Sequence, residues 1–295
     1  MTITEKNSLK IAIASGKGGT GKTLFSTNLA AFLSQEQKTL LVDLDVEEPN
    51  DFLFINGTTE NVSDQYKMIP LWDESKCTLC GSCSNTCNYH AVVQLGTFIA
   101  VFNELCHSCY ACSELCPAQA LPMQKHKMGT VTTISSGDLT FIESRLEVGE
   151  EQAVPLIHQT HDLVDTHYKD IPIQVFDCPP GTSCPVVAAC KNADFVVLVT
   201  EPTPFGMNDL RLAVETMQKI QKPVGVVINR FGIGNNEVEK YCVQAQIPIL
   251  AKIPFDRKIA EHYSNGELVY DKIEYLSTSL YQLITAIQHA VKHHV

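Results

Sequence analysis

The chain has 295 residues, 44% of them hydrophobic, and a formal net charge of −11 at pH 7. This length allows one large domain or two, and the negative charge argues against a nucleic-acid partner held on a broad basic surface. The first residues, Met1–Asn7, lack the apolar segment of a signal peptide, and no apolar run is long enough to span a bilayer. We therefore expect a cytoplasmic protein that binds neither nucleic acid nor membrane.

A glycine-rich stretch lies between an apolar run, Ile11–Ala14, and a segment with the hydrophobic period of a helix. Its residues are Gly16, Lys17, Gly18, Gly19, Thr20, Gly21, Lys22 and Thr23. A strand, a glycine-rich loop and a helix in this order are typical of a phosphate-binding loop, because glycines let backbone N–H groups turn toward an anion. We expect Lys22 to reach the β- and γ-phosphates of a nucleotide and the Thr23 hydroxyl to ligate Mg²⁺. The alternative is a tight turn that binds no ligand, and such a turn would need neither Lys22 nor Thr23.

The loop contains a further lysine, Lys17, which narrows the range of families that this sequence resembles. The sequence K-G-G-T-G-K-T resembles the deviant Walker A loop of the MinD/ParA group of ATPases, which includes the nitrogenase iron protein and the Mrp-type iron–sulfur carriers. The resemblance implies that the loop binds ATP or ADP, and that hydrolysis is slow and stimulated by a partner. It also implies a homodimer across the nucleotide site, in which Lys17 reaches the ATP of the other subunit. A solvated loop lysine is the alternative.

Two apolar segments that end in acids resemble the switches of the same group. The first is Thr39–Asp45, where the resemblance implies that Asp45 lies beside the attacking water and Mg²⁺; a helix cap is the alternative. The second is Ile173–Asp177, which is followed by C-P-P-G. Here the resemblance implies that Asp177 binds Mg²⁺ through water and that the Gly181 N–H meets the γ-phosphate. The implied catalytic residues are Lys17, Lys22, Asp45 and Asp177.

Later segments complete the same domain. Val224–Ile228 is typical of a strand and ends at Asn229 and Arg230, where the resemblance implies that the asparagine contacts the adenine edge; a strand-end cap is the alternative. A further segment around Pro254 resembles the late loop of the group near the base. The C-terminal segment has apolar residues at helical spacing without a basic polar face, so we expect it to pack in the core and not on a membrane. Those residues are Leu276, Leu280, Leu283 and Ile287.

Eight of the twelve cysteines form an internal duplication. The first motif is Cys77-x-x-Cys80-x-x-Cys83-x-x-x-Cys87, and the second is Cys106-x-x-Cys109-x-x-Cys112-x-x-x-Cys116. Each cysteine of the second motif follows its counterpart by 29 residues. Without an export signal, metal binding explains such clusters better than disulfides do. The arrangement is that of a bacterial ferredoxin with two clusters.

The spacing predicts which thiolates share a cluster. Three cysteines at x-x intervals surround one cubane, and the fourth points away toward the other cluster. We therefore assign two 4Fe–4S sites, one with Cys77, Cys80, Cys83 and Cys116 and one with Cys87, Cys106, Cys109 and Cys112. Zinc sites normally use paired C-x-x-C hooks and fit this pattern less well. Asn88 replaces the proline that usually follows the fourth cysteine, but that proline is not a ligand.

The remaining thiols are Cys178, Cys184, Cys190 and Cys242. We interpret Cys190 and Cys242 as small buried hydrophobes. Cys184 lies seven residues after Asp177, an offset comparable to that of a bridging-cluster ligand in the nitrogenase iron protein. A thiol near a dimer face is the simpler interpretation, and a bridging cluster would need Cys178 as its second thiolate.

The whole pattern predicts an α/β protein. Residues 1–64 and 129–295 form a P-loop NTPase domain with a mostly parallel sheet covered by helices, and residues 65–128 form a small α+β ferredoxin-like insertion. The first hypothesis for function is a nucleotide-dependent dimer that couples ATP and Mg²⁺ to electron transfer through two 4Fe–4S clusters. The alternatives are a maturation or carrier ATPase for iron–sulfur clusters, and a ParA/MinD-type positioning ATPase with a redox-sensing module. Each requires a redox or client partner protein.

Overall fold

The computed structural model describes residues 8–293, which fold into two compact units. The large unit comprises the described parts of Met1–Val62, Val131–Arg145 and Ile157–Val295. The small unit comprises Ser63–Thr130 and Leu146–Leu156. The segment Leu146–Leu156 lies outside the predicted insertion, and the cysteine pattern did not predict that this segment belongs to the small unit.

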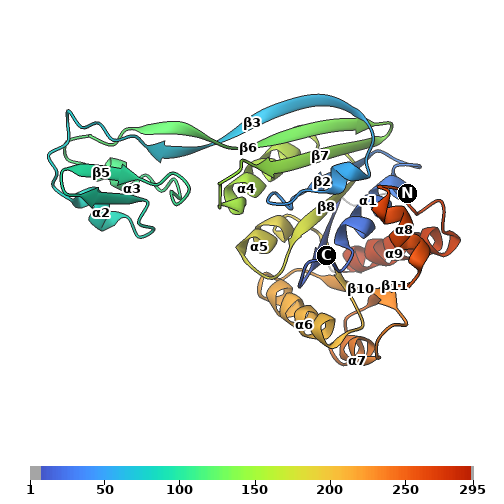
Figure 1. Ribbon diagram of the computed structural model, residues 1–295. Coiled ribbons are helices and arrows are strands. Elements are labelled where there is room, and N and C mark those ends of the chain that lie inside the picture. The colour runs from blue at the N-terminus through green and yellow to red at the C-terminus, as the bar shows by residue number, and fades with distance from the viewer. Residues whose placement is uncertain (1–7, 294–295) are drawn as a thin grey trace. The chain divides into compact units, whose positions relative to one another are not determined.

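A nine-stranded sheet with the order β11-β10-β9-β1-β8-β2-β7-β6-β3 runs through the large unit (Figure 1). Its strands are β1 (Leu9–Ser15), β2 (Thr39–Asp43), β3 (Thr58–Pro70), β6 (Met123–Ser136), β7 (Leu139–Leu146), β8 (Ile173–Pro180), β9 (Phe195–Thr200), β10 (Val224–Phe231) and β11 (Ile249–Pro254). Every pairing from β11 to β7 is parallel, which confirms the predicted mostly parallel sheet. The chain passes from one unit to the other along β3 and β6.

Helices flank this parallel sheet, as expected for strands that are apolar on both faces (Figure 1). They are α1 (Lys22–Leu33), α4 (Ala153–His167), α5 (Cys184–Cys190), α6 (Pro204–Lys219), α7 (Glu237–Gln244), α8 (Arg257–Ser264) and α9 (Glu274–His293). A short 3₁₀ turn, Asp51–Leu53, follows β2. Side-chain caps begin two of these helices: the Thr203 hydroxyl accepts the Gly206 N–H at α6, and the Asp256 carboxylate accepts the Lys258 N–H at α8.

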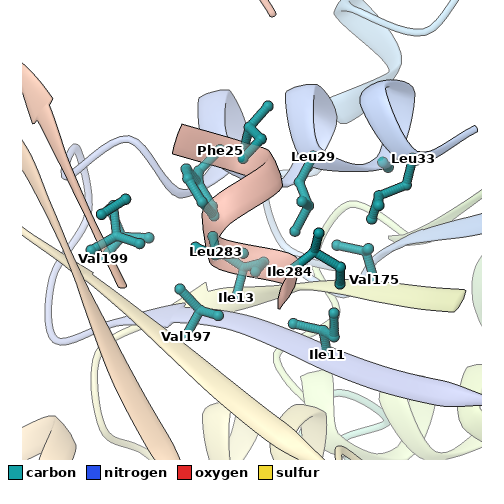
Figure 2. Packing of buried hydrophobic residues seen from close by; sticks show 14 of the residues in the cluster. Ile11, Ile13, Phe25, Leu29, Leu33, Val175, Val197, Val199, Leu283 and Ile284 are labelled. Atoms are coloured by element: carbon teal, nitrogen blue, oxygen red, sulfur yellow. The ribbon is translucent and has the colours of Figure 1, made fainter. Parts of the chain in front are cut away.

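Successive residues along each strand point to opposite faces of the sheet, and each face is covered by its own layer of helices. Figure 2 shows Leu29 of α1 and Leu283 of α9 packed above Ile13 and Val175 of the central strands. The next residue of β8, Phe176, faces the other way, and its ring lies 5.2 Å from that of His161 in α4. The apolar face of α9 is buried, so the predicted core packing of the C-terminal helix is confirmed.

The small unit contains two short helices and a β-hairpin beside its parts of β3 and β6. The helices are α2 (Ser82–Thr86) and α3 (Ala111–Glu114), and the antiparallel hairpin is formed by β4 (Val92–Leu95) and β5 (Phe98–Val101). The duplication of the cysteine motifs is also present in the backbone, where residues with positive φ recur 29 positions apart. The pairs are Leu79 and Ser108, Gly81 and Tyr110, and His90 and Gln119.

Candidate functional site

The glycine-rich loop connects the end of β1 to the first turn of α1. Gly19 and Gly21 have φ values of 77° and 98°, which only glycine adopts readily, and Gly21 precedes the first helical residue, Lys22. Gly16 is required for a different reason, because a Cβ atom there would lie 2.2 Å from the Asp209 carbonyl oxygen of α6. The loop therefore has the backbone conformation and the helix N-terminus that an anion site needs.

Strand register brings both predicted switch acids to the loop. Asp43 at the end of β2 lies opposite Asp177 in β8, and Asp177 lies opposite Ile13 in β1. The Thr23 hydroxyl donates to Asp177 Oδ2 at 3.0 Å, which joins the first turn of α1 to the second switch. Asp45 lies two residues beyond Asp43 and is half-buried. These residues meet at the carboxyl edge of the sheet, where ligands of open α/β folds bind.

Two carboxylates that the sequence did not single out as site residues complete the acidic cluster. Asp43 accepts the N–H groups of Asp45, Asn50 and Asp51 at 3.0, 2.9 and 3.1 Å, so it organises the loop after β2. Asp51 is fully buried, accepts no hydrogen bond from an N–H or hydroxyl group of the described residues, and can share a hydrogen bond with Asp177 only while one of the two carboxyl groups is protonated. An acid after a Pro-Asn turn resembles an exposed loop residue, so only the structure reveals its burial.

Burial raises the pKa values of these carboxyl groups. The pKa of Asp45 rises to about 6, mainly through burial and against the opposing charge of Lys22. Burial, reinforced by the charge of Asp177, raises the pKa values of Asp43 and Asp51 well above their usual range. The pKa of Asp177 is also raised by burial, although Lys22 opposes the shift. Four carboxyl groups therefore lie close together near Lys22, and each holds its proton to a higher pH than an exposed carboxyl group does.

The donor chemistry fits Mg²⁺ bound with a nucleotide. Magnesium takes hydroxyl and carboxylate oxygens together with water and phosphate. Thr20 Oγ1 is buried and has no hydrogen-bond partner among residues 8–293, so it is free to bind water or ligand. Asp177 is hydrogen-bonded to Thr23 and, while one of the two acids is protonated, to Asp51. Thr23, Asp45 and Asp177 are the residues that would supply such oxygens.

The other predicted nucleotide residues make specific contacts within the chain. The Gly181 N–H donates to the Ser15 carbonyl oxygen at 2.9 Å, so it must leave that partner to meet a phosphate. The Lys17 ammonium lies 3.7 Å from a carboxylate oxygen of Glu201, and Arg230 pairs with the other oxygen of the same group at 2.6 Å. The sequence did not identify Glu201, which follows β9 and is buried.

The residues expected near the base lie at the ends of β10 and β11. The Asn229 amide donates to the Thr20 carbonyl oxygen at 2.7 Å, and its side-chain oxygen accepts the Arg230 N–H at 2.9 Å. Asn229 thus supports the phosphate loop directly in this structure. Pro254 is exposed at the end of β11, where it pairs with Phe231 of β10.

Each predicted cysteine set lines its own cavity in the small unit. Cys77, Cys80, Cys83 and Cys116 line the first cavity. Cys87, Cys106, Cys109 and Cys112 line the second cavity. The structure therefore brings each fourth cysteine into the cavity of the other motif. The described residues contain no cluster of His, Cys, Asp or Glu arranged around a single metal ion. A four-iron cluster places one thiolate on each iron, so its ligands do not meet at one point.

The backbone around these cavities offers hydrogen bonds to sulfur. The Ala120 N–H donates to Cys116 Sγ at 3.2 Å, and the Ser82 N–H lowers the pKa of the exposed Cys80 thiol. Burial raises the pKa of Cys112 to about 11 and also raises that of Cys106, so these two groups would become thiolates near neutral pH only with a bound cation. Soft sulfur donors with N–H groups around them fit an iron–sulfur cluster.

The four other cysteines lie in the large unit. Cys178 and Cys190 are fully buried with their sulfur atoms 3.7 Å apart, and burial raises the pKa of Cys242 to about 11. Cys184 is exposed at the start of α5. Because Cys178 faces the interior, it does not present a thiolate beside Cys184 for a bridging cluster.

The parallel sheet and the loop at its carboxyl edge define a P-loop nucleotide-binding fold. The chain matches the family described as CobQ/CobB/MinD/ParA nucleotide binding domain over residues 11–269, and it belongs to this family. It is 30% identical over 259 residues to an uncharacterized protein of Methanocaldococcus jannaschii, covering 87% of this chain and 90% of that protein. It is 25% identical to the iron–sulfur cluster carrier protein of Pseudomonas fragi, covering 87% of this chain and 76% of the carrier.

Solved structures share the fold at lower identity. The cell division ATPase MinD of Pyrococcus furiosus superposes with a TM-score of 0.59 at 18% identity, covering 96% of this chain and 99% of MinD. This likeness supports the α/β P-loop fold alone. Within the described residues, no helix has the length and apolar character needed to cross a membrane.

Proposed function

We propose that this protein is an ATPase whose small unit binds two 4Fe–4S clusters. The observation that carries the proposal is the division of eight cysteines between two cavities, four to each, in the crossed pairing of a duplicated ferredoxin motif. A bound cluster of this kind supplies a one-electron redox centre. Anaerobic purification followed by iron and sulfide analysis tests the proposal, which expects about eight iron atoms per chain. A protein without iron after reconstitution contradicts it.

The large unit would hydrolyse ATP through residues of the glycine-rich loop and the two switches. Lys22 would bind the β- and γ-phosphates, and Thr23, Asp45 and Asp177 would hold Mg²⁺, which would offset the charge of the phosphates. Asp45 orients the attacking water, and the Gly181 N–H leaves Ser15 to bind the γ-phosphate. The hydrogen bond from Thr23 to Asp177 and the position of Asp177 in β8 beside β1 support this assignment. A phosphate-release assay on the purified chain measures the activity.

The proposal includes a homodimer formed with ATP. Lys17 is only about one-third exposed and pairs with Glu201 of its own chain, so it would exchange this partner for the ATP of a second subunit. Light scattering with and without a non-hydrolysable ATP analogue tests this step. We expect a dimer with the analogue and a weaker dimer for Lys17→Ala. Analogue-independent association of both proteins contradicts the exchange.

Delivery of iron–sulfur clusters to a client protein is the role that the comparisons favour. The carriers of Pseudomonas fragi and Aquifex aeolicus are similar to this chain over 87% of its length. A transfer assay from the loaded protein to an apo-ferredoxin, with and without MgATP, tests this role. We expect the acceptor to gain its cluster spectrum and the donor to lose iron in parallel. Full retention of iron by the donor contradicts delivery from these cavities.

Electron transfer is the second candidate, and the cavities themselves favour it. Each cavity draws four cysteines from one chain, and Cys106 and Cys112 are buried, which suits a permanent cofactor better than cargo. A redox titration followed by EPR, with and without MgATP, distinguishes the two roles. A midpoint potential that shifts with MgATP while iron is retained supports gated electron transfer.

A further inference from the structure

The chain's single tryptophan lies beside the first cysteine cavity. Two backbone hydrogen bonds fix its position, from the Leu71 N–H to the Pro122 oxygen and from the Asp73 N–H to the Ala120 oxygen, both at 2.8 Å. The Trp72 ring also packs edge-on against Phe98, with 5.0 Å between ring centroids. The indole is therefore held in one place at the cavity wall.

The indole nitrogen of Trp72 is buried, and the structure provides no acceptor for it among residues 8–293. A buried donor without a partner costs about 1–3 kcal/mol, so buried tryptophan N–H groups usually find one. Trp72, Cys77 and Cys83 pack against the same buried residues, and Trp72 lines the cavity together with Cys77, Cys80, Cys83 and Cys116. A ligand bound in this cavity by the four cysteines would therefore offer sulfur as the hydrogen-bond acceptor that the Trp72 indole N–H lacks.

We propose that the Trp72 indole N–H donates a hydrogen bond to a sulfur atom of the cluster bound by the first cysteine set. This inference rests on the proposed iron–sulfur function. A donor to sulfur stabilises the more negative, reduced state, because its positive end faces the added charge. Trp72 therefore raises the midpoint potential of this cluster and is a positioning residue for its sulfur atoms.

The duplication makes the effect specific to one cluster. The residue 29 positions after Trp72 is Val101, whose side chain has no donor. The second cavity is lined instead by Tyr89, His107 and Tyr110, with the rings of Tyr89 and His107 stacked at 3.6 Å. The two sites have equal ligand sets and unequal surroundings, so their potentials differ.

The test compares the full-length wild-type protein with Trp72→Phe, which retains a ring and removes the N–H. Both are purified anaerobically, assayed for iron and titrated by EPR. We expect equal iron content, a lower midpoint potential for one cluster and an unchanged potential for the other. Tyr89→Phe is the matched control from the second cavity and should leave the Trp72-dependent potential unchanged. Two unchanged potentials in a fully loaded Trp72→Phe protein overturn the proposal.

A second measurement needs no variant. Wild-type protein labelled with ¹⁵N in its tryptophan indole is reduced, and pulsed EPR is used to detect magnetic coupling between a cluster and that nitrogen. We expect a ¹⁵N coupling together with an exchangeable proton. The absence of this coupling in a loaded protein overturns the hydrogen bond while leaving the proposed function intact. A wild-type chain that binds no iron overturns both.

Discussion

Replacing Asp51 by asparagine should stabilise the nucleotide-free protein. The carboxyl group is fully buried in the field of Asp177 and Asp43, and it can hydrogen-bond to Asp177 only while one of the two carboxyl groups is protonated. Asparagine has almost the same shape, carries no charge and offers an N–H to Asp177 at any pH. Relief of one unsatisfied buried group is worth about 1–3 kcal/mol. For a domain of this size, each kcal/mol corresponds to about 2–4 °C in Tm.

The sign of the pH dependence follows from the direction of the pKa shift. Burial raises the pKa of Asp51 in the folded state, so folded protein holds this proton more tightly than unfolded protein does. Its contribution to stability is full below the unfolded pKa, about 4, and is lost as pH rises through the folded value. The asparagine variant does not lose this stability as the pH rises. Its folded state should therefore be much more stable than that of the wild type at alkaline pH and only slightly more stable near pH 4.

Thermal melts followed by circular dichroism, without nucleotide or Mg²⁺, measure this difference. Asp162→Asn, at an exposed position of α4, is the matched control and should change the Tm little at any pH. Addition of MgADP should stabilise the wild type more than Asp51→Asn, because the cation then offsets the buried negative charge. A variant that is less stable than the wild type at alkaline pH, or an advantage independent of pH, refutes the reasoning.

Three other outcomes are expected. Lys22→Ala should abolish ATP hydrolysis in a phosphate-release assay and leave iron content at the wild-type level, since the lysine belongs to the phosphate loop; loss of iron as well would show that nucleotide binding is needed for assembly. Cys112→Ser should remove about half of the iron, whereas Cys184→Ser should remove none, because Cys112 lines a cavity with three other cysteines and Cys184 is exposed at the start of α5. The kcat/KM for MgATP should fall up to tenfold per pH unit below about pH 6, where Asp45 becomes protonated. A kcat/KM that does not change with pH below about pH 6 would exclude Asp45 as the group that orients water.

Local patterns were sufficient where the chemistry dictates both residue type and spacing. The loop from Gly16 to Thr23 needs glycines for its backbone angles and a lysine and a hydroxyl for its ligands, so its sequence identifies it. The cysteine motifs are similarly constrained, and their repeat after 29 residues predicted which sulfur atoms share a cavity. Periodicity likewise identified the buried face of α9.

Contacts between distant segments could not be predicted in this way. Glu201 pairs with Lys17 and Arg230, and nothing near it in the sequence indicates a site. Leu146–Leu156 joins the small unit because Glu150 forms a buried ion pair with Lys67 at 2.6 Å, and one glutamate in a polar stretch carries no such information. Burial decides the role of these residues, and burial is a property of the fold.

The chain itself connects the nucleotide site to the cysteine motifs. Asp43 holds the N–H groups of Asn50 and Asp51, and β3 begins only a few residues later. Along that strand, in the small unit, the Met68 carbonyl oxygen accepts the Ser108 hydroxyl at 2.7 Å, between two cysteines of the second set. One strand of the chain therefore joins the loop held by Asp43 to the segment that contacts the second cysteine motif. The titration with and without MgATP measures whether the proposed nucleotide site and the proposed clusters are coupled.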